Sequence, residues 1–501
     1  MKETLTRSVV VGIFALTVLT GLLVELVGGV WPGRGLNDMV SPYSMRSGRY
    51  SALVEQRLDQ DSVVRKAVLP VMNEAMYRLF HKVAPQVVMG EDGWLFLAST
   101  VLDYPSAEAA SLLPDVISSI GKTAAWLEAQ GTKVLLVVPP TKAALHPDKL
   151  PAYLMYQPVY GEVIGRLRDA GLDVLDVRDV LPTTAESHYA NDTHWTQGTA
   201  LATALELDRR IRAGWDAAGG GPLPGTPVDG ELHRPPEHLH SGDLTLMLGL
   251  LEGGALEKSF HEPQQLVIGR RRGTEETLGT DRPQPIALSG TSYSHGYGLA
   301  AILSALLGRE VEKRTGPGQP SCFGVAGIVR QSVLGERPFP RFLVWEIPER
   351  YFFLEQQEIL SSLANVLRVA DMYPAKKLPL AIERRELIEI ETVAEDAAGL
   401  TATANWHARI IYHLAAPLTG DGSLAIAFSV TAEDPGVTRV YLDTGGGFSA
   451  NPDIAPRLDG LASPTLIVVP LVAGRPVLRM RIDPIHERGE FHLSPIELWQ
   501  R

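Results

Sequence analysis

Between about residue 85 and residue 355, short apolar runs alternate with longer segments of helical periodicity. The short runs are rich in aliphatic residues and predict buried strands at residues 133–138, 172–177 and 285–288. Apolar residues spaced three and four apart predict helices at residues 109–130, 160–170 and 299–307. This alternation predicts an α/β domain of three layers, in which helices cover both faces of a parallel sheet. The ligand site of such a sheet lies beyond the carboxyl ends of its strands.

The pattern changes after about residue 380, where strand-like runs follow one another without intervening helices. Glycine-rich turns separate these runs, which lie at residues 424–430, 438–442, 465–471 and 477–482. Regular short strands of this kind predict a C-terminal antiparallel β-sandwich. At the other end of the α/β region, a polar linker and one amphipathic helix at residues 62–80 are predicted.

The N-terminal segment is a mostly apolar run from residue 9 to residue 31, interrupted by Glu25. About 20 apolar residues span a membrane, so the run predicts a signal peptide or a single membrane anchor rather than a buried core helix. No Ala-x-Ala-like cleavage site follows the run, which favours the uncleaved anchor. Because Lys2 and Arg7 precede the run and stay in the cytoplasm, the rest of the chain is expected outside the cytoplasm.

Four parts of the chain are therefore predicted: a signal anchor at residues 1–31, a linker with a spacer helix at 32–84, an α/β domain at 85–385 and the sandwich at 386–501. The formal net charge of −12 argues against a nucleic-acid partner, because phosphate binding needs a basic surface. The single cysteine, Cys322, excludes an intramolecular disulfide and is interpreted as a small buried residue.

One motif places a carboxylate two residues before a histidine, in Asn191-Asp192-Thr193-His194-Trp195-Thr196. A histidine activates a serine hydroxyl when a third group holds its tautomer and orientation, and an aspartate is suited to this role. Because residues 196–207 have helical periodicity, Asp192 and Thr193 are equally suited to cap that helix, with His194 in its first turn. The two interpretations are compatible.

A second motif supplies the serine, in Ser289-Gly290-Thr291-Ser292-Tyr293-Ser294, between a predicted strand and a predicted helix. A serine at such a turn has its hydroxyl at the carboxyl edge of the sheet, near unpaired N–H groups that stabilise an oxyanion. An ordinary turn is the alternative. The segment is not the Gly-x-Ser-x-Gly elbow, because position 294 is serine. We predict a catalytic triad of Asp192, His194 and Ser292.

Together these motifs resemble those of the periplasmic alginate O-acetyltransferase family of the AlgX/AlgJ type, whose catalytic domain is similar to the SGNH hydrolases with a permuted motif order. Three further segments resemble the family in its own order. Residues 90–97 resemble its Gly-x-Asp-Gly-Trp-Leu-Phe hairpin, residues 137–142 its strand ending in Val-Pro-x-Lys, and residues 343–351 a strand with a Glu-Arg-Tyr end. The resemblance covers roughly residues 85–355.

This resemblance implies an O-acetyltransferase that modifies an alginate-like exopolysaccharide in the periplasm through an acetyl-serine intermediate. It also implies substrate contacts for Lys142, Tyr293, Arg350 and Tyr351, the last two either lining the acceptor site or assisting the oxyanion. No cofactor and no metal are implied. A multipass membrane acyltransferase that supplies the acetyl group is an expected partner, with other proteins of polysaccharide biosynthesis and export.

Two other functions fit the same residues. An acetyl-serine reacts with water as well as with sugar if the pocket admits water, so a carbohydrate acetyl esterase is one alternative. A non-catalytic glycan-binding scaffold of an export complex is the other. The C-terminal domain resembles a carbohydrate-binding module, and its candidate glycan-binding aromatics are Trp406 and Tyr441, followed by Phe448 and Trp499. Most aromatics of such a domain are core residues.

Two stretches, residues 219–236 and 252–282, predict surface insertions because they combine glycine, proline and charge with little periodicity. Between them, Ser241-Gly242-Asp243-Leu244 resembles a family element and is interpreted as a helix cap in preference to a substrate-contacting loop. The basic run Arg270-Arg271-Arg272 is interpreted as a solvated loop in preference to a site for an anionic polysaccharide.

Overall fold

The computed structural model describes residues 55, 62–181, 187–316, 321–432, 437–455, 464–485 and 489–501, without the side chains of residues 405–407. The anchor predicted at residues 1–31 lies outside these residues. Within the ranges just given, no helix combines the length and the apolar character needed to cross a membrane.

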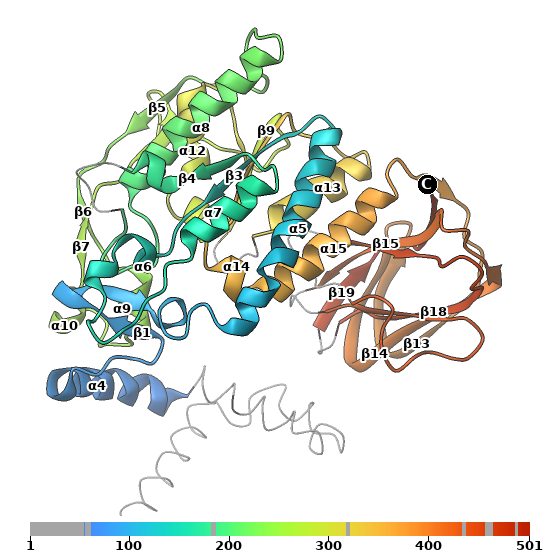
Figure 1. The fold of residues 1–501 in the computed structure, drawn as a ribbon. Helices are drawn as coiled ribbons and strands as arrows, with labels where there is room; N and C mark the ends of the chain where they lie inside the picture. The colour runs from blue at the N-terminus through green and yellow to red at the C-terminus, as the bar shows by residue number, and fades with distance from the viewer. Residues whose placement is uncertain are drawn as a thin grey trace, which may run out of the picture.

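A five-stranded parallel sheet forms the centre of the α/β region, in the order β10-β9-β11-β3-β4 (Figure 1). Its strands are β3 (Lys133–Val138), β4 (Val174–Asp176), β9 (Ile286–Gly290), β10 (Glu312–Thr315) and β11 (Phe342–Glu346). All four pairings are parallel, so the prediction of a parallel sheet is confirmed. The central strand β11 lies between β9 and β3.

Alternate residues of each central strand enter opposite cores. On β3, Val134, Leu136 and Val138 belong to one core cluster, whereas Leu135 and Val137 belong to the other. The first cluster packs against α5 (Ala107–Ala129), α7 (Tyr160–Asp169), α13 (Phe323–Val333) and α15 (Gln356–Asp371). The second packs against α8 (Gln197–Ala217) and α12 (Leu299–Leu307). Helices therefore cover both faces of the sheet, and the predicted three layers are confirmed.

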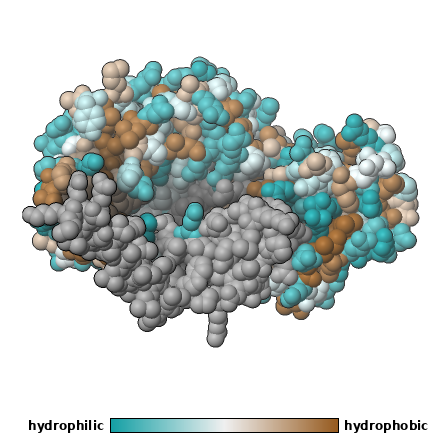
Figure 2. Space-filling view, turned by 90° about the horizontal axis from the view of Figure 1, so that it is seen from below, coloured by the Kyte–Doolittle hydropathy of each residue, from teal (hydrophilic) through white to brown (hydrophobic). Residues whose placement is uncertain are grey.

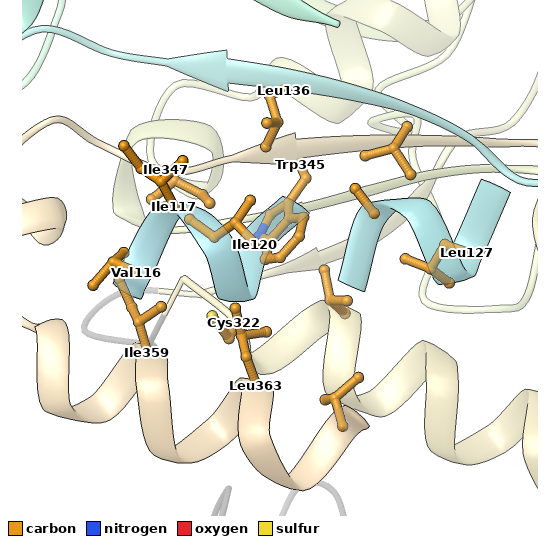
Figure 3. Packing of buried hydrophobic residues seen from close by; sticks show 14 of the residues in the cluster. Val116, Ile117, Ile120, Leu127, Leu136, Cys322, Trp345, Ile347, Ile359 and Leu363 are labelled. Carbon is orange, nitrogen blue, oxygen red and sulfur yellow. The ribbon is translucent and has the colours of Figure 1, made fainter. Parts of the chain in front are cut away.

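Helices α5 and α15 fix the first core. Figure 3 shows Ile117 and Ile120 of α5 next to Trp345 of β11, and Val116 of α5 above Ile359 of α15, with Leu363 of α15 further along that helix. Cys322 is buried in the same cluster, as its sequence context predicts. Apolar side chains at three- and four-residue spacing on each helix produce this arrangement.

An additional layer lies at the carboxyl edge of the sheet. Its strands are β1 (Val87–Met89) and β2 (Leu95–Leu97), which form the predicted antiparallel hairpin, and the pair β6 (His238–His240) with β7 (Glu262–Gln264). The pair β5 (Gly230–His233) with β8 (Ile268–Arg271) packs instead on helix α12. Its short helices are α6 (Lys142–Leu145), α9 (Asp243–Met247), α10 (Ala255–Lys258), α11 (Ser292–His295) and α14 (Tyr351–Leu354). The stretches predicted as surface insertions thus contain strand pairs, and parts of them pack at the site described below.

Helix α4 (Val63–Phe80) precedes this layer and has no buried residue of its own (Figure 1). The Asn73 amide donates to the carbonyls of Leu248 and Gly249, at 3.1 Å each, which ties the helix to the end of α9. On the face seen from below, hydrophobic residues are scattered among hydrophilic ones wherever described residues are visible (Figure 2).

The C-terminal region is antiparallel, as predicted, and its pairing links nine strands through β19, which pairs with both β14 and β15. Whether these strands form a sandwich stays a prediction. Its first strand, β12, begins at Lys376, before the predicted boundary at residue 386. The strands are β12 (Lys376–Leu378), β13 (Ile382–Asp396), β14 (Gly399–Leu418), β15 (Leu424–Ala432), β16 (Arg439–Asp443), β17 (Thr465–Pro470), β18 (Val477–Asp483), β19 (Gly489–Leu493) and β20 (Glu497–Gln500).

Candidate active site

Ser292 lies where strand β9 ends and helix α11 begins. Thr291 is the N-cap residue of α11, and its hydroxyl accepts from the backbone N–H of Tyr293. Ser292 is half-buried, so part of the residue is open to solvent. The strand-to-turn-to-helix placement predicted for this serine is confirmed.

His194 links Ser292 to Asp192 through two hydrogen bonds. His194 Nε2 lies 2.8 Å from Ser292 Oγ, and His194 Nδ1 lies 2.6 Å from Asp192 Oδ1. The backbone N–H of His194 also donates to Asp192 Oδ1, at 3.0 Å. The three residues predicted as a triad are thus brought together with the spacing that proton transfer from serine to histidine requires.

Reciprocal hydrogen bonds connect the two loops that carry the triad. The Trp195 indole N–H donates to the Tyr293 carbonyl at 3.1 Å, and the Tyr293 hydroxyl donates to the Thr193 carbonyl at 2.7 Å. The Tyr293 and His194 ring centroids are 4.7 Å apart. The residues next to His194 and Ser292 therefore fix the distance between them.

The second oxygen of Asp192 has its own donors. His240 Nε2 lies 2.8 Å from Asp192 Oδ2, and the Tyr297 hydroxyl donates to the same oxygen at 3.2 Å. Burial alone would raise the pKa of Asp192, but the hydrogen bonds from His194 and His240 outweigh it and hold that pKa well below its usual range. Asp192 is therefore ionised at neutral pH and oriented by both of its oxygens.

Asp243 is a second carboxylate beside His194, with Oδ2 3.6 Å from Nδ1. It accepts from the backbone N–H of Thr193 at 2.7 Å and from the Thr193 hydroxyl. Burial and the charge of Asp192 raise the pKa of Asp243, so of the two carboxylates Asp243 is the one that more readily takes up a proton. Asp243 begins helix α9 after the N-cap Gly242, but its carboxylate holds the His194 loop.

The capping interpretation of Asp192 and Thr193 is wrong, because the N-cap residue of α8 is Thr196, whose hydroxyl accepts from the Thr199 N–H. His194 therefore precedes the helix and does not project from its first turn. This leaves the Asp192 carboxylate available for His194.

Residues between α8 and β9 form hydrogen bonds with the loop that carries Asp192 and His194. The Asn191 amide donates to the carbonyls of His240 and Phe260, at 2.8 Å each, and the Asn191 backbone N–H donates to Glu262 at 3.0 Å. Gly242 allows this close approach, because a Cβ there would lie 2.1 Å from the Asn191 carbonyl oxygen. Sequence reasoning missed His240 because it lies in a stretch without periodicity.

One oxygen or nitrogen each of Asp192, His194 and Asp243 lies within 4.8 Å of the others, close enough to share a metal ion. The donor set does not favour one. His194 Nδ1 faces Asp192 Oδ1, and Asp243 already receives the hydroxyl of Thr193. A metal would have to displace these hydrogen bonds and leave Ser292 with a histidine that no longer serves as its base.

A narrow pocket, lined by the chain neighbours of His194 and Ser292, contains three of the four predicted substrate-contacting residues. Lys142, Tyr293 and Arg350 line it with Thr193 and Leu244. The Arg350 guanidinium lies over the Tyr293 ring, 5.2 Å from its centroid, and 5.5 Å from the centroid of Tyr351. Tyr351 is buried in the first core cluster, so it supports Arg350 instead of lining the pocket.

Lys142 is buried, and its Nζ donates to the carbonyls of Leu95 at 2.6 Å and Ala190 at 3.0 Å. Burial lowers the pKa of Lys142 to about 7, although the charges of Asp192 and Asp243 oppose this shift. A neutral amine has two N–H donors, which matches the two carbonyl acceptors. Lys142 therefore titrates near neutral pH in the wall of the pocket.

We expect the stability of the protein to report this titration. Because the unfolded chain binds a proton at Lys142 up to about pH 10.4 and the folded chain only up to about 7, the free energy of unfolding should rise with pH between these values. Each unit of pKa difference contributes about 1.4 kcal/mol. In Lys142→Met this rise should be lost. Urea denaturation of both proteins from pH 7 to pH 10 measures the difference, and equal pH slopes would contradict it.

The aromatic residues predicted to bind glycan lie elsewhere. The side chain of Trp406 in β14 is outside the described residues. Tyr441 is 6% exposed and lies under the Arg481 guanidinium, 4.4 Å from its centroid, and Trp499 is 2% exposed. Neither ring has a free face on which a sugar could stack, so the structure gives no support to these two candidates. Phe448 is half-buried, with Arg479 5.1 Å from its ring centroid.

The basic run is not a free loop, because Arg270 and Arg271 lie in strand β8. Arg270 pairs with Glu231, Arg271 with Glu276 and Arg272 with Asp229, at 3.2, 2.8 and 3.0 Å. Because each guanidinium already has an acidic partner, the arginine run does not favour binding of an anionic polymer.

The α/β region is similar to that of known proteins. The family model described as "SGNH hydrolase-like domain, acetyltransferase AlgX" matches residues 87–349, more than half of the 501 residues. "Probable alginate O-acetylase AlgJ" of Pseudomonas aeruginosa is 28% identical over 359 residues, covering 66% of this chain and 87% of that protein. Its namesake from Azotobacter vinelandii is 27% identical over 364 residues, covering 69% and 89%. The solved structure of Pseudomonas aeruginosa AlgX has a TM-score of 0.54 at 16% identity and covers 83% of this chain and 94% of that one.

Proposed function

This chain belongs to the SGNH hydrolase-like acetyltransferase family of AlgX, and on that premise we propose that it O-acetylates an alginate-like exopolysaccharide through Ser292, His194 and Asp192. The observation that carries the proposal is the continuous chain of hydrogen bonds from Ser292 Oγ through His194 to Asp192, with lengths of 2.8 and 2.6 Å. The permuted order, with Asp192 and His194 before Ser292, belongs to the same proposal.

In the first half-reaction, His194 Nε2 takes the proton of Ser292 as Oγ attacks the carbonyl carbon of an acetyl donor. The imidazolium that forms is stabilised by Asp192, which its hydrogen bonds keep ionised. When the tetrahedral intermediate collapses, the bond to the leaving group breaks and His194 returns its proton to that group. The product is acetyl-Ser292.

In the second half-reaction, a sugar hydroxyl takes the place of the departed group. His194 removes its proton as the sugar oxygen attacks the acetyl carbonyl, and Ser292 Oγ leaves and regains the proton from His194. The sugar gains one acetyl group and the enzyme is restored. No cofactor takes part in either step.

Charge on the tetrahedral intermediates needs donors near Ser292. The backbone N–H of Thr291 is already bound to Glu346, whereas the N–H of Ser292 donates to no residue of the described chain. We assign the Ser292 N–H to the oxyanion, with the Arg350 guanidinium in the adjoining pocket as the cationic partner.

The cellular setting is part of the proposal. Residues 1–31 are proposed to anchor the chain to the inner membrane, with the acetyltransferase domain in the periplasm. The acetyl donor is proposed to come from a multipass membrane acyltransferase, within a set of polysaccharide biosynthesis and export proteins. The C-terminal sheet is proposed to bind glycan, with Trp406 and Phe448 as its remaining candidate aromatics.

A transfer assay tests the proposed function. The full chain is incubated with a chromogenic acetyl ester and with oligouronate or neutral oligosaccharide acceptors, and both ester hydrolysis and mass gain on the sugar are measured. We expect acetyl gain on oligouronates at a rate well above acetyl loss to water. Hydrolysis without any acetylated sugar would identify an esterase, and absence of both reactions would favour a scaffold.

A further inference from the structure

The end of strand β11 touches both neighbouring active-site turns. β11 pairs with β9 on one side and with β3 on the other. The turn after β9 carries Ser292 directly after Thr291, and the turn after β3 carries Lys142 directly after Thr141. Where these strands diverge, the backbone N–H groups of the two threonines lose their strand partners.

Glu346, the last residue of β11, meets the first turn. Its carboxylate accepts from the Thr291 backbone N–H at 2.7 Å, from the Thr291 hydroxyl at 3.1 Å and from the Ser294 hydroxyl at 3.0 Å. Glu346 is 0% exposed. Gly290 makes the approach feasible, because a Cβ there would lie 2.6 Å from Glu346 Oε2. The residues on both sides of Ser292 and Tyr293 are thus bound to one carboxylate.

Glu349, three residues on, meets the second turn in the same way. Its carboxylate accepts from the Thr141 backbone N–H at 2.7 Å and from the Thr141 hydroxyl at 3.1 Å. Glu349 is also 0% exposed. The next residue, Arg350, lines one pocket together with Lys142 and with Tyr293, the neighbour of Ser292 in the chain.

We propose that Glu346 and Glu349 are paired positioning residues, Glu346 setting the place of the Ser292 nucleophile and Glu349 setting the place of Lys142, both relative to Arg350. The inference rests on the proposed role of Ser292. In this proposal, the end of strand β11 fixes the distance between the Ser292 nucleophile and the pocket.

The chemistry of a carboxylate suits this task. An ionised carboxylate accepts at both oxygens without offering a donor. The Thr291 hydroxyl lies 3.1 Å from both oxygens of Glu346. At Glu349, both Thr141 donors bind Oε2 and the Tyr104 hydroxyl donates to Oε1 at 3.5 Å. Burial raises the pKa of both groups, that of Glu349 to about 7, and the hydrogen bonds from the threonines oppose the rise. A glutamine keeps the shape but turns an NH₂ group toward one of the donors.

The test compares Glu346→Gln, Glu349→Gln and Glu312→Gln in the full chain, measuring kcat and KM for acetyl transfer from a chromogenic ester to an oligouronate. Glu312 is a matched control, since it is equally buried and hydrogen-bonded but lies at the start of β10, paired with Arg337 and Arg314. We expect Glu346→Gln to lower kcat about 10- to 100-fold with little change in KM, because a small displacement of a nucleophile is costly. Glu349→Gln should mainly raise KM, by about 5-fold or more.

The threonines provide a second, independent set of variants in case a glutamine variant does not fold, which melting curves would show. Thr291→Ser keeps the hydroxyl donor and should retain the wild-type kcat, whereas Thr291→Val should lose activity as Glu346→Gln does. Ser292→Ala distinguishes failure of the proposed function from failure of the positioning role. If Ser292→Ala transfers acetyl at the wild-type rate, the proposed function fails. If Ser292→Ala is inactive but Glu346→Gln and Thr291→Val match Glu312→Gln, the positioning role fails alone.

Discussion

Ser292→Ala is expected to lower kcat for acetyl transfer by about 10⁴-fold or more, because loss of a triad nucleophile removes the covalent route entirely. The variant should fold normally, since among the described residues the Ser292 hydroxyl has one hydrogen-bond partner, His194, and Ser292 is only half-buried. Initial rates of ester consumption and of sugar acetylation, measured with melting curves, test this expectation.

The matched control is Ser289→Ala, three residues earlier on β9. Ser289 is fully buried, and its hydroxyl has no hydrogen-bond partner among the described residues. It should keep the wild-type kcat. Equal loss in both variants would mean that Ser292→Ala acts through folding, and activity retained in Ser292→Ala would remove Ser292 from the chemistry.

Asp192→Asn is expected to lower kcat by about 10³- to 10⁴-fold while leaving the fold intact. Asp192 accepts from His194 Nδ1 at 2.6 Å and thereby leaves Nε2 free to accept the serine proton. An asparagine amide facing Nδ1 favours the tautomer that carries its proton on Nε2, which cannot serve as base. It also lacks the charge that stabilises the imidazolium. Steady-state kinetics from pH 5 to pH 9 report both losses.

Asp243→Asn is the comparison that makes the result specific. Asp243 lies 3.6 Å from His194 Nδ1, but its hydrogen bonds go to Thr193. We expect a loss of about 10-fold or less, in line with the loss of a supporting hydrogen bond. If Asp243→Asn were the more damaging of the two, the roles assigned to the carboxylates would have to be exchanged.

Much of the site was predictable because catalytic residue types stood close together in the chain. Asp192 and His194 are two residues apart, and Ser292 follows a run whose burial on both faces is evident from composition. The supporting residues gave no such signal. His240 and Asp243 lie in a stretch without periodicity, and only the folded chain brings them to Asp192 and His194.

The roles of Glu346 and Glu349 could not be predicted from the sequence, for a different reason. A glutamate at the end of an apolar strand is ordinarily interpreted as leaving the core for solvent. Here both are fully buried, because the turns after β9 and β3 present unpaired N–H groups at that point. Burial of a charge of this kind depends on donors contributed by distant segments, which no local pattern reveals.

In the C-terminal region, the sequence pattern likewise predicts apolar strands but not a polar one. β15 and β17 are apolar and were predicted, whereas β13 is mostly exposed and polar on both faces and was not. β13 is held by its antiparallel pairing with β14. Tyr441 illustrates the related problem for aromatics, since its ring is covered by Arg481, which forms an ion pair with Asp483.

Trapping the covalent intermediate tests whether Ser292 carries the acetyl group. The full chain is mixed with an acetyl ester in the absence of sugar, quenched with acid, digested and mapped by mass spectrometry. We expect one acetyl group on Ser292, absent from Ser292→Ala, and its transfer to an oligouronate added before the quench. If the acetyl group is found on another residue and passes from there to sugar, or if Ser292→Ala acetylates sugar at the full rate, Ser292 is not the nucleophile.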